Sequence, residues 1–427
     1  MNKGAGIRSG ALMWLTAALS SGTALASDIQ VRFELELTKG TGAAAAQIVV
    51  RQQAGALREV VLDKDRVRKT AGPGRITTDA DGVHWVPPAE GGTLRYQAML
   101  DHRRKADDPR SYDAWVGERF ALFRGERAFP IRSWRRARGT TLDGELAITV
   151  PEGWSLVTPY LPEGPSSGPQ AGSTRTLGHL AIHNPGKRLP RPLGWIIAGD
   201  IGTRRDWIGG IEITVSAPRG GRMERIAMLG LLRWTLPRLV AELQPGATQL
   251  PYVSIVSAGD PMWLGALSAP NSIYVNSARP LISENGTSTI VHEMVHVLLR
   301  DLKVPRDQDW IVEGLAEYLS LRALKDSGTI SPQRYAAAID GFRERGADIK
   351  TLRTPSASGP VTARAVAIFH DLDLELRAAG TRKATLASVV EGFLRSNKPL
   401  TLISLRAAAR TIIGKPARTL YIRAIPD

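Results

Sequence analysis

The chain has 427 residues and no cysteine, which excludes disulfides and a lipidated cysteine anchor, and its 43% hydrophobic content allows two or three domains with substantial cores. The formal net charge is +15, with basic runs at residues 102–105 and 132–138 that could bind nucleic acid or anionic envelope polymers. No nucleic-acid-binding motif accompanies these runs, so we interpret them as a solvated basic face with at most weak contact to anionic polymers.

The first 26 residues have the pattern of a secretory signal peptide. Lys3 and Arg8 form a charged start, an apolar run follows at residues 10–18, and Ala-Leu-Ala at residues 24–26 supplies a small-x-small cleavage pattern. An uncleaved membrane anchor is the alternative, but the apolar run is too short to span a bilayer comfortably. We therefore expect cleavage after Ala26 and a periplasmic or secreted protein without a transmembrane segment.

Residues 27–205 show β-strand patterns and little helical periodicity. The clearest pattern is at residues 29–37, where every second side chain is apolar. Further short apolar runs are separated by turn signals such as Pro-Gly at residues 73–74 and Asp-Gly at residues 81–82. Several short strands between turns predict an N-terminal β-sandwich.

From residue 206 the pattern changes to alternating strands and helices. A strand is expected at residues 211–216, followed by a long amphipathic helix at residues 223–243 and a second buried strand. A last strand is expected at residues 272–276, and the resemblance described below places it at the edge of a cleft. Because a free strand edge can pair with an extended peptide, Tyr274 on this strand is a candidate substrate contact.

His-Glu-Met-Val-His at residues 292–296 lies in a segment whose apolar residues recur with helical spacing. Residues four apart share a helix face, so His292 and His296 can hold one zinc ion at about 2.0–2.1 Å each. Glu293 leans over the same metal and can take a proton from bound water. Random placement of the 7 His and 19 Glu gives about 0.005 such motifs. Two surface histidines are the alternative, which the apolar flanks disfavour because unpaired histidines would be buried there.

Two imidazoles leave zinc under-coordinated, so a third protein ligand is required. Glu313 follows His296 by seventeen residues, in a second helix expected at residues 309–326. A helix, a short turn and a returning helix would bring Glu313 beside the histidines, and its apolar neighbours disfavour a solvated acid. Glu317, one turn further along the same face, can accept a hydrogen bond from the far nitrogen of a ligand histidine and fix its tautomer.

These residues resemble the gluzincin zinc metallopeptidases, whose third zinc ligand is a glutamate on the helix after His-Glu-x-x-His. The Trp-x-x-Glu-Gly-x-Ala-x-Tyr run at residues 310–318 is most similar to the aminopeptidase N and glycyl-aminopeptidase families. The strong resemblance covers residues 251–325. It implies an α+β multidomain chain in which a thermolysin-like α/β zinc domain at residues 206–330 follows the β-sandwich and precedes a helical region at residues 331–427.

The resemblance also places a possible substrate-binding segment. Gly-Ala-Leu-Ser-Ala at residues 265–269 occupies the position of the family's Gly-x-Met-Glu-Asn, which makes Gly265, Ala266 and Ser268 candidate substrate contacts. The family's glutamate grips the free amine of the substrate, and the matching residue here is Ser268. Aminopeptidase specificity therefore does not follow from the motif.

A catalytic tyrosine of the glycyl-aminopeptidase family has no counterpart here. In that family the tyrosine stands three residues before a glycine near the start of a C-terminal helix. Ala365 aligns with the glycine, so Thr362 takes the position of the tyrosine. Tyr335, on the preceding predicted helix, is the only nearby phenol and the other candidate for contacting substrate.

The predicted function is that of an exported zinc metallopeptidase with one Zn²⁺ per chain and a peptide or protein substrate. Zinc lowers the pKa of bound water, while Glu293 acts as general base and then delivers the proton to the leaving amine. The alternative is a zinc-bearing binding module that keeps the peptidase fold without turnover. The residues at positions 268 and 362 support that alternative, whereas Glu293 opposes it because a general base matters mainly for chemistry.

Overall fold

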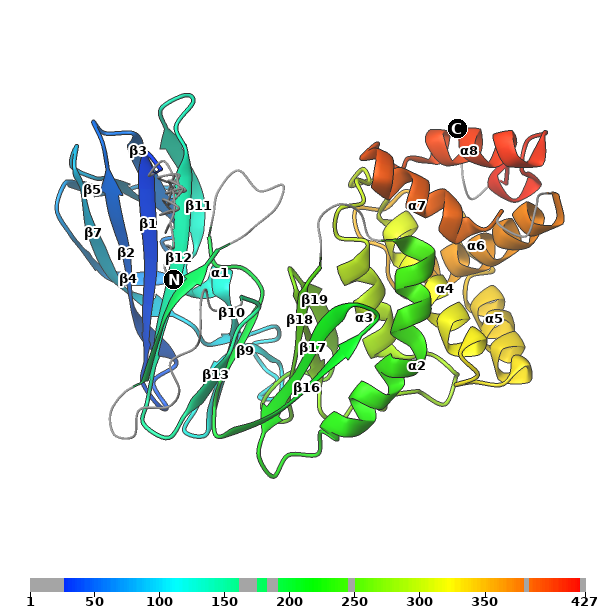
Figure 1. The fold of residues 1–427 in the computed structure, drawn as a ribbon, viewed down its shortest axis with the longest axis horizontal. Coiled ribbons are helices and arrows are strands. Elements are labelled where there is room, and N and C mark those ends of the chain that lie inside the picture. Colours follow the sequence, from blue (N-terminus) through cyan, green and yellow to red (C-terminus); the bar gives the residue numbers. More distant parts are fainter. Residues whose placement is uncertain (1–26, 161–174, 183–190, 245–249, 380–383, 423–427) are drawn as a thin grey trace, which may run out of the picture.

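The computed structural model describes residues 27–160, 175–182, 191–244, 250–379 and 384–422 (Figure 1). The predicted signal peptide lies outside these residues, so its cleavage stays a prediction. A β-rich part occupies one side of the molecule and a helical part the other, with a mixed sheet between them. No helix in the described ranges combines the length and the apolar character needed to cross a bilayer.

The β-rich part is built from three sheets. Its elements in chain order are β1 (Ile29–Leu37), β2 (Ala43–Gln52), β3 (Leu57–Leu62), β4 (Val67–Ala71), β5 (Arg75–Thr78), β6 (Val83–Val86), β7 (Gly91–Met99), β8 (His102–Arg103), β9 (Tyr112–Val116), β10 (Phe120–Arg124), the short helix α1 (Gly125–Ala128), β11 (Ile131–Arg136), β12 (Leu142–Val150), β13 (Ser155–Val157), β14 (Arg175–Ala181) and β15 (Trp195–Gly199). The sheets have the strand orders β14-β12-β1-β2-β7-β4, β11-β3-β6-β5 and β13-β15-β10-β9-β8.

The first two of these sheets pack face to face, and the alternation seen in the sequence explains why. Every second residue of β1 is buried, which turns one face of the strand toward the other sheet. Phe33 of β1 meets Trp134 of β11 edge-on, with ring centroids 6.3 Å apart. The third sheet was not predicted. All five residues of β15 are buried because its two faces contribute to two different cores, one of them shared with the mixed sheet.

The mixed sheet consists of β16 (Ile201–Ile208), β17 (Ile211–Pro218), β18 (Tyr252–Ala258), β19 (Ala266–Ala269) and β20 (Ser272–Asn276). Its strand order is β16-β17-β18-β20-β19, with the three inner strands parallel and the two outer strands antiparallel to their neighbours.

Two expectations about this sheet need correction. The strand predicted at the cleft edge, now β20, is internal, because β19 pairs with its outer side and forms the edge instead. The domain change predicted at residue 206 falls inside β16, which pairs with β17 from Ile201 onward. Both errors concern strand pairing, which depends on contacts between segments that hydrophobic periodicity does not report.

The helical part packs against one face of the mixed sheet (Figure 1). Its elements are α2 (Arg225–Leu243), α3 (Thr289–Leu298), α4 (Asp309–Asp326), α5 (Pro332–Arg345), α6 (Pro360–Ala379), α7 (Leu386–Ser396), α8 (Leu402–Ile413) and the 3₁₀ turn η1 (Arg418–Leu420). The Ser288 side chain caps α3 by accepting a hydrogen bond from the Val291 amide.

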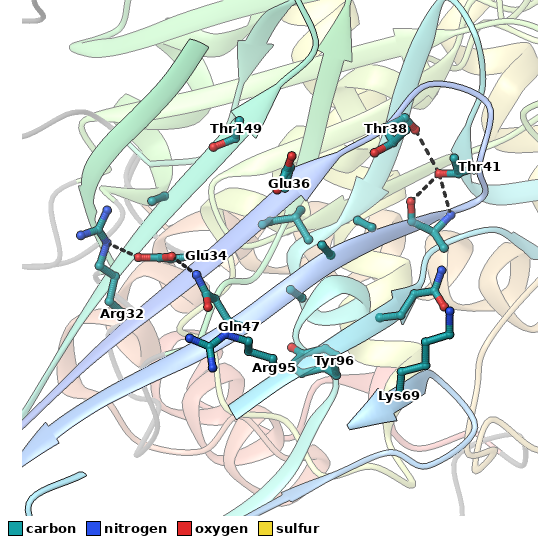
Figure 2. A pocket seen from close by; sticks show the side chains of 17 residues that line it. Arg32, Glu34, Glu36, Thr38, Thr41, Gln47, Lys69, Arg95, Tyr96 and Thr149 are labelled. Carbon is teal, nitrogen blue, oxygen red and sulfur yellow. Dashed lines mark hydrogen bonds and ion pairs between the residues drawn. The ribbon is translucent and has the colours of Figure 1, made fainter. Parts of the chain in front are cut away.

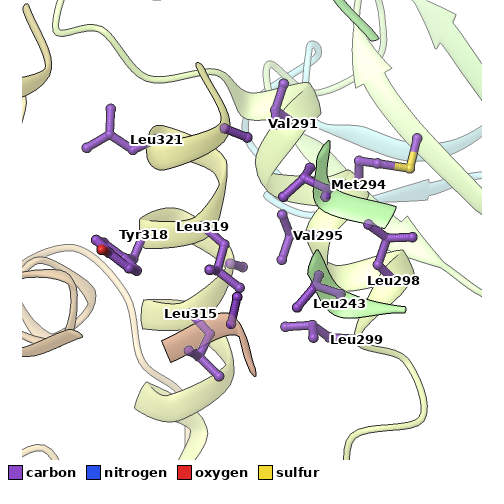
Figure 3. Packing of buried hydrophobic residues seen from close by; sticks show 14 of the residues in the cluster. Leu243, Val291, Met294, Val295, Leu298, Leu299, Leu315, Tyr318, Leu319 and Leu321 are labelled. Carbon is purple, nitrogen blue, oxygen red and sulfur yellow. The ribbon is translucent and has the colours of Figure 1, made fainter. Parts of the chain in front are cut away.

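The packing of α3 against α4 orients the motif histidines. Figure 3 shows Val291 and Val295 of α3 facing Leu315 and Leu319 of α4, and all four side chains are buried. Because these residues recur every four positions, each helix turns one apolar stripe toward its partner. The polar residues of the motif therefore lie on an adjoining face of α3.

A glycine sets the distance between α4 and α6. A Cβ atom at Gly314 would lie 2.6 Å from the Ala365 Cβ and 2.8 Å from the Phe369 ring. Beside this contact the Trp310 and Phe369 rings stack with centroids 5.5 Å apart. One further turn along, the Tyr318 hydroxyl donates to Asp373 Oδ2 at 2.7 Å. The two helices approach so closely because residue 314 has no side chain.

Gly314→Ala is expected to lower the free energy of unfolding by about 1–3 kcal/mol, because the added methyl group forces α4 and α6 apart. Gly341→Ala in α5 is the matched control, since nothing lies within 4 Å of its added Cβ. That change is expected to stabilise the protein by about 0.5–1 kcal/mol through helix propensity. Urea unfolding of both variants measures the difference, and equal stabilities would contradict the close packing described here.

Candidate metal centre

Three side chains from α3 and α4 bring their polar atoms together. His292 Nε2 and His296 Nε2 lie 3.1 Å apart. Glu313 Oε1 lies 3.4 Å from His296 Nε2, and Glu313 Oε2 lies 3.7 Å from His292 Nε2. Among the described residues this is the one group of three His, Cys, Asp or Glu side chains compact enough to hold a metal ion.

The dimensions of this triangle fit zinc. Ligand bonds of about 2.0–2.1 Å at tetrahedral angles place neighbouring ligand atoms about 3.3 Å apart, and the observed separations of 3.1, 3.4 and 3.7 Å surround that value. The three side chains are 14%, 15% and 29% exposed, so water can reach the fourth coordination position. The donor set of two imidazoles and one carboxylate is one that catalytic zinc sites use.

Glu317 lies behind His292, as the sequence predicted. Its Oε2 atom is 2.7 Å from His292 Nδ1, the ring nitrogen that faces away from the triangle. A carboxylate at this place holds the proton on Nδ1 and leaves Nε2 with a lone pair for a metal. Glu317 and Glu313 lie one turn apart on the same face of α4, so one helix supplies both carboxylates.

The charges of the cluster depend on one another. Burial lowers the pKa of His292, but hydrogen bonds to Glu313 and Glu317 outweigh burial and raise this pKa to about 10. Burial raises the pKa of Glu313, but hydrogen bonds from His292 and His296 outweigh it and lower this pKa to about 2. Carboxylates on one side therefore stabilise positive charge at the centre of the cluster, the charge that a divalent cation would supply.

Glu293 is held from outside its own helix. Its side chain is buried, and its Oε2 atom accepts a hydrogen bond of 2.7 Å from the backbone N–H of Ser268 on β19. The sequence predicted Ser268 as a candidate substrate contact, and the structure shows that its backbone amide contacts Glu293. Backbone donors leave no trace in residue type, so this contact could not be read from the sequence.

No protein-family model matches the sequence, and no curated protein matches it. Solved structures do match. The M1 zinc metallopeptidase of Deinococcus radiodurans has a TM-score of 0.63 at 15% identity, with 94% of each chain covered. The chain has the M1 zinc metallopeptidase fold.

Two further solved structures agree. A mutant of the M1 zinc metallopeptidase from Deinococcus radiodurans, bound to a Tyr-Ser-Ala substrate, has a TM-score of 0.61 at 16% identity, covering 93% of this chain and 94% of its own. An aminopeptidase N family protein from Idiomarina loihiensis has a TM-score of 0.64 at 14% identity, covering 85% of this chain and 70% of its own. The predicted resemblance to gluzincin metallopeptidases is thus confirmed for the fold, while the roles of individual residues rest on the geometry above.

Three of the predicted substrate contacts lie on or beside the edge strand of this M1 fold. A Cβ at Gly265 would fall 2.2 Å from the Trp263 indole nitrogen, so a glycine is required there for packing. Ala266 is half-buried against the helical core, and Ser268 is half-buried beside Glu293. The segment therefore reaches the metal centre through its backbone and through small, uncharged side chains.

The prediction that Tyr274 contacts substrate is wrong. Its side chain is completely buried, lies against the tilted rings of Trp195 and Trp263, and donates a hydrogen bond of 2.8 Å to the Trp263 carbonyl. Burial raises the pKa of its hydroxyl well above the ordinary range. The residue was predicted as a substrate contact because β20 was placed at the edge, but an internal strand buries both of its faces.

Thr362 and Tyr335 have different positions in the M1 fold. Thr362 lies in the first turn of α6, three residues before Ala365, whose methyl group packs against Gly314 beside Glu313. Burial raises the pKa of Tyr335 to about 12, opposed by a hydrogen bond with Tyr318. Figure 3 shows Tyr318 on the side of α4 that faces away from α3. Tyr335 therefore lies with Tyr318 on the side of α4 that faces away from α3, contrary to its candidate role, and Thr362 lies one turn before the residue that packs against Gly314.

A separate hollow of about 750 Å³ lies on the exposed face of the six-stranded sheet (Figure 2). None of its lining residues belongs to α3 or α4. Its floor contains small side chains of β2, and charged side chains of both signs surround it. Arg32 Nε lies 3.0 Å from Glu34 Oε1, and the Gln47 amide donates to the same carboxylate, so these groups already satisfy one another. We assign the chemistry to the metal centre instead.

Elemental analysis of the purified mature protein is expected to give one zinc per chain, and His296→Ala is expected to lose most of it because only two protein ligands remain. His84→Ala is the control. His84 lies in the β-rich part, 3.1 Å from Glu59 and 3.0 Å from Asp79, so its loss should leave the zinc content unchanged. Full zinc retention in His296→Ala would show that the ligand assignment is wrong.

Proposed function

We propose that this protein is a zinc-dependent metallopeptidase that hydrolyses peptide bonds. The observation that carries the proposal is the His292–His296–Glu313 triangle, which has zinc dimensions, with a buried glutamate beside it in a chain of M1 fold. The Tyr-Ser-Ala substrate in the Deinococcus radiodurans structure supports a peptide as the substrate class.

Zinc held by His292, His296 and Glu313 would polarise the scissile carbonyl and lower the pKa of bound water. Glu293 takes the proton of that water as general base. Because its Oε2 atom accepts from the Ser268 amide, Oε1 is the oxygen left for the proton. Glu293 then delivers the proton to the leaving amine, which lets the C–N bond break without expelling an amide anion. Glu317 keeps His292 in the tautomer that binds metal.

The edge strand offers a place for an extended substrate. In an antiparallel pair, backbone groups point alternately toward the partner strand and away from it. The Gly265 carbonyl accepts from the Asn276 amide, so the backbone groups of Ala266 and Ser268 point away from β20. A peptide that pairs with Ala266 would lie along β19, next to Glu293.

A zinc-bearing binding module is the second candidate. Its support is the residue at position 268, which gives no carboxylate for a substrate amine, together with the threonine at position 362, which is a poor donor to a developing oxyanion. A hydrogen-bond donor aimed at such an oxyanion is typically worth about 10²–10³ in rate. A module of this kind would bind peptides and retain zinc but show no turnover that depends on Glu293.

Glu293→Gln separates the two candidates. For an enzyme, the variant should keep its zinc and lose at least about 10²-fold in kcat on a mixed peptide library, the lower range for a positioned acid–base group. Glu126→Gln is the matched control, because Glu126 also accepts a backbone hydrogen bond, from Gly194, but lies in α1. Equal peptide cleavage by wild type and Glu293→Gln would contradict the proposed role of this glutamate.

We also propose that the protein is exported, on the strength of the charged start, the apolar run and the Ala-Leu-Ala pattern at residues 24–26. Signal peptidase is expected to cleave after Ala26. N-terminal sequencing of protein recovered outside the cytoplasm should therefore begin at Ser27. A chain that retains Met1 would instead indicate a membrane anchor.

A further inference from the structure

One peptide group of β19 is held at both of its ends. The carbonyl of Leu267 accepts a hydrogen bond of 2.8 Å from the indole Nε1 of Trp195. The amide N–H of the same peptide group, which belongs to Ser268, donates the 2.7 Å hydrogen bond to Glu293 Oε2. A single planar unit thus connects a tryptophan of the β-rich part with the proposed general base.

We infer that Trp195 is a positioning residue for Glu293, acting through the Leu267–Ser268 peptide group. The inference rests on the proposed function for its effect on rate, but the contact itself does not depend on any activity. A trans peptide group is planar and rigid, with its C=O and N–H pointing in opposite directions. The Leu267 carbonyl faces β20, where Leu267 pairs with Tyr274, and the indole adds a second donor to it. Fixing the carbonyl therefore fixes the direction of the N–H.

Trp195 is itself immobilised. Its side chain is completely buried, and its own amide donates a hydrogen bond of 2.8 Å to Ser272 Oγ. The indole ring lies against Tyr274, with centroids 5.0 Å apart. The guanidinium of Arg124, a residue of β10, lies 5.7 Å from the centroid of the indole ring. An anchor with this many contacts can hold the Leu267 carbonyl in one place.

The electrostatics of the arrangement favour the same conclusion. A donor at the carbonyl of a peptide group polarises that group, which makes its N–H a better donor. Glu293 is only 8% exposed, so its carboxylate depends on protein donors for stabilisation. Losing the indole donor should weaken the Ser268–Glu293 hydrogen bond and let the carboxylate adopt orientations in which it does not face the attacking water.

Trp195→Phe removes the indole donor and keeps an aromatic ring. We expect kcat to fall about tenfold, the scale of one net hydrogen bond, while KM and zinc content stay unchanged. Amide hydrogen exchange at Ser268 should accelerate by a similar factor, and this readout does not need turnover. Trp85→Phe is the matched control, because Trp85 is also fully buried and its indole donates at 2.8 Å to the Pro73 carbonyl, within the β-rich part. The Trp85→Phe variant should lose about as much thermal stability as Trp195→Phe, but it should keep the wild-type kcat and the wild-type rate of amide exchange at Ser268.

Ser268→Pro tests whether Trp195 acts on Glu293 through the amide of Ser268. Proline removes the N–H, and it is tolerated on an edge strand where that N–H takes no part in the ladder. Adding Trp195→Phe to Ser268→Pro should then cause no further fall in kcat, because both changes remove one contact. Additive losses, wild-type Ser268 exchange in Trp195→Phe, or an equal loss of kcat in Trp85→Phe would each overturn the inference. If the wild type shows no Glu293-dependent hydrolysis, the proposed function fails. The rate of amide hydrogen exchange at Ser268 alone then supports or overturns the inference that Trp195 positions Glu293 through the Leu267–Ser268 peptide group.

Discussion

Compensation of charge in a half-buried space is the constraint on which the metal centre depends. Glu313 contacts both His292 and His296, and Glu317 contacts His292, so this half-buried cluster brings carboxylates together around a centre that requires positive charge. A divalent cation bound to both imidazoles and to Glu313 meets this requirement. The contacts of Glu313 and Glu317 with the histidines also orient the imidazole rings. The same contacts therefore determine both the affinity for a cation and the geometry of its ligands.

The packing of the surrounding helices holds the histidine and glutamate side chains in fixed relative positions. The apolar stripes of α3 and α4 hold the two helices at one separation, and Gly314 lets α6 approach α4 from the opposite side. The buried Asp373 of α6 accepts hydrogen bonds from Tyr318, Arg377 and the Leu386 amide, which ties α4 to α6 and α7. Each ligand therefore projects from a helix that is packed on more than one side, as a site with fixed geometry requires.

Sequence reasoning succeeded where the relevant geometry is local. Residues four apart on a helix share a face whatever the rest of the chain does, so the approach of His292 to His296 could be predicted from periodicity. Glu313 lies on the next helix, and its approach was predicted from the short turn expected between the two helices. Sequence reasoning failed where strands had to be ordered. Tyr274 was assigned to substrate because a short apolar strand looks the same at the edge and in the middle of a sheet. The contact between Trp195 and Leu267 links residues far apart in the chain, and no pattern of residue types records it.

The junction between the two parts of the molecule has a mechanical consequence. β15 ends at Gly199 in a sheet of the β-rich part, and β16 begins at Ile201 in the mixed sheet, so a single residue separates them. A hinge needs a segment that can change its backbone angles without breaking pairing, and here pairing continues on either side of Asp200. The two parts should respond to force or heat as one unit. Neither could be exchanged for a homologous module without rebuilding two sheets at once.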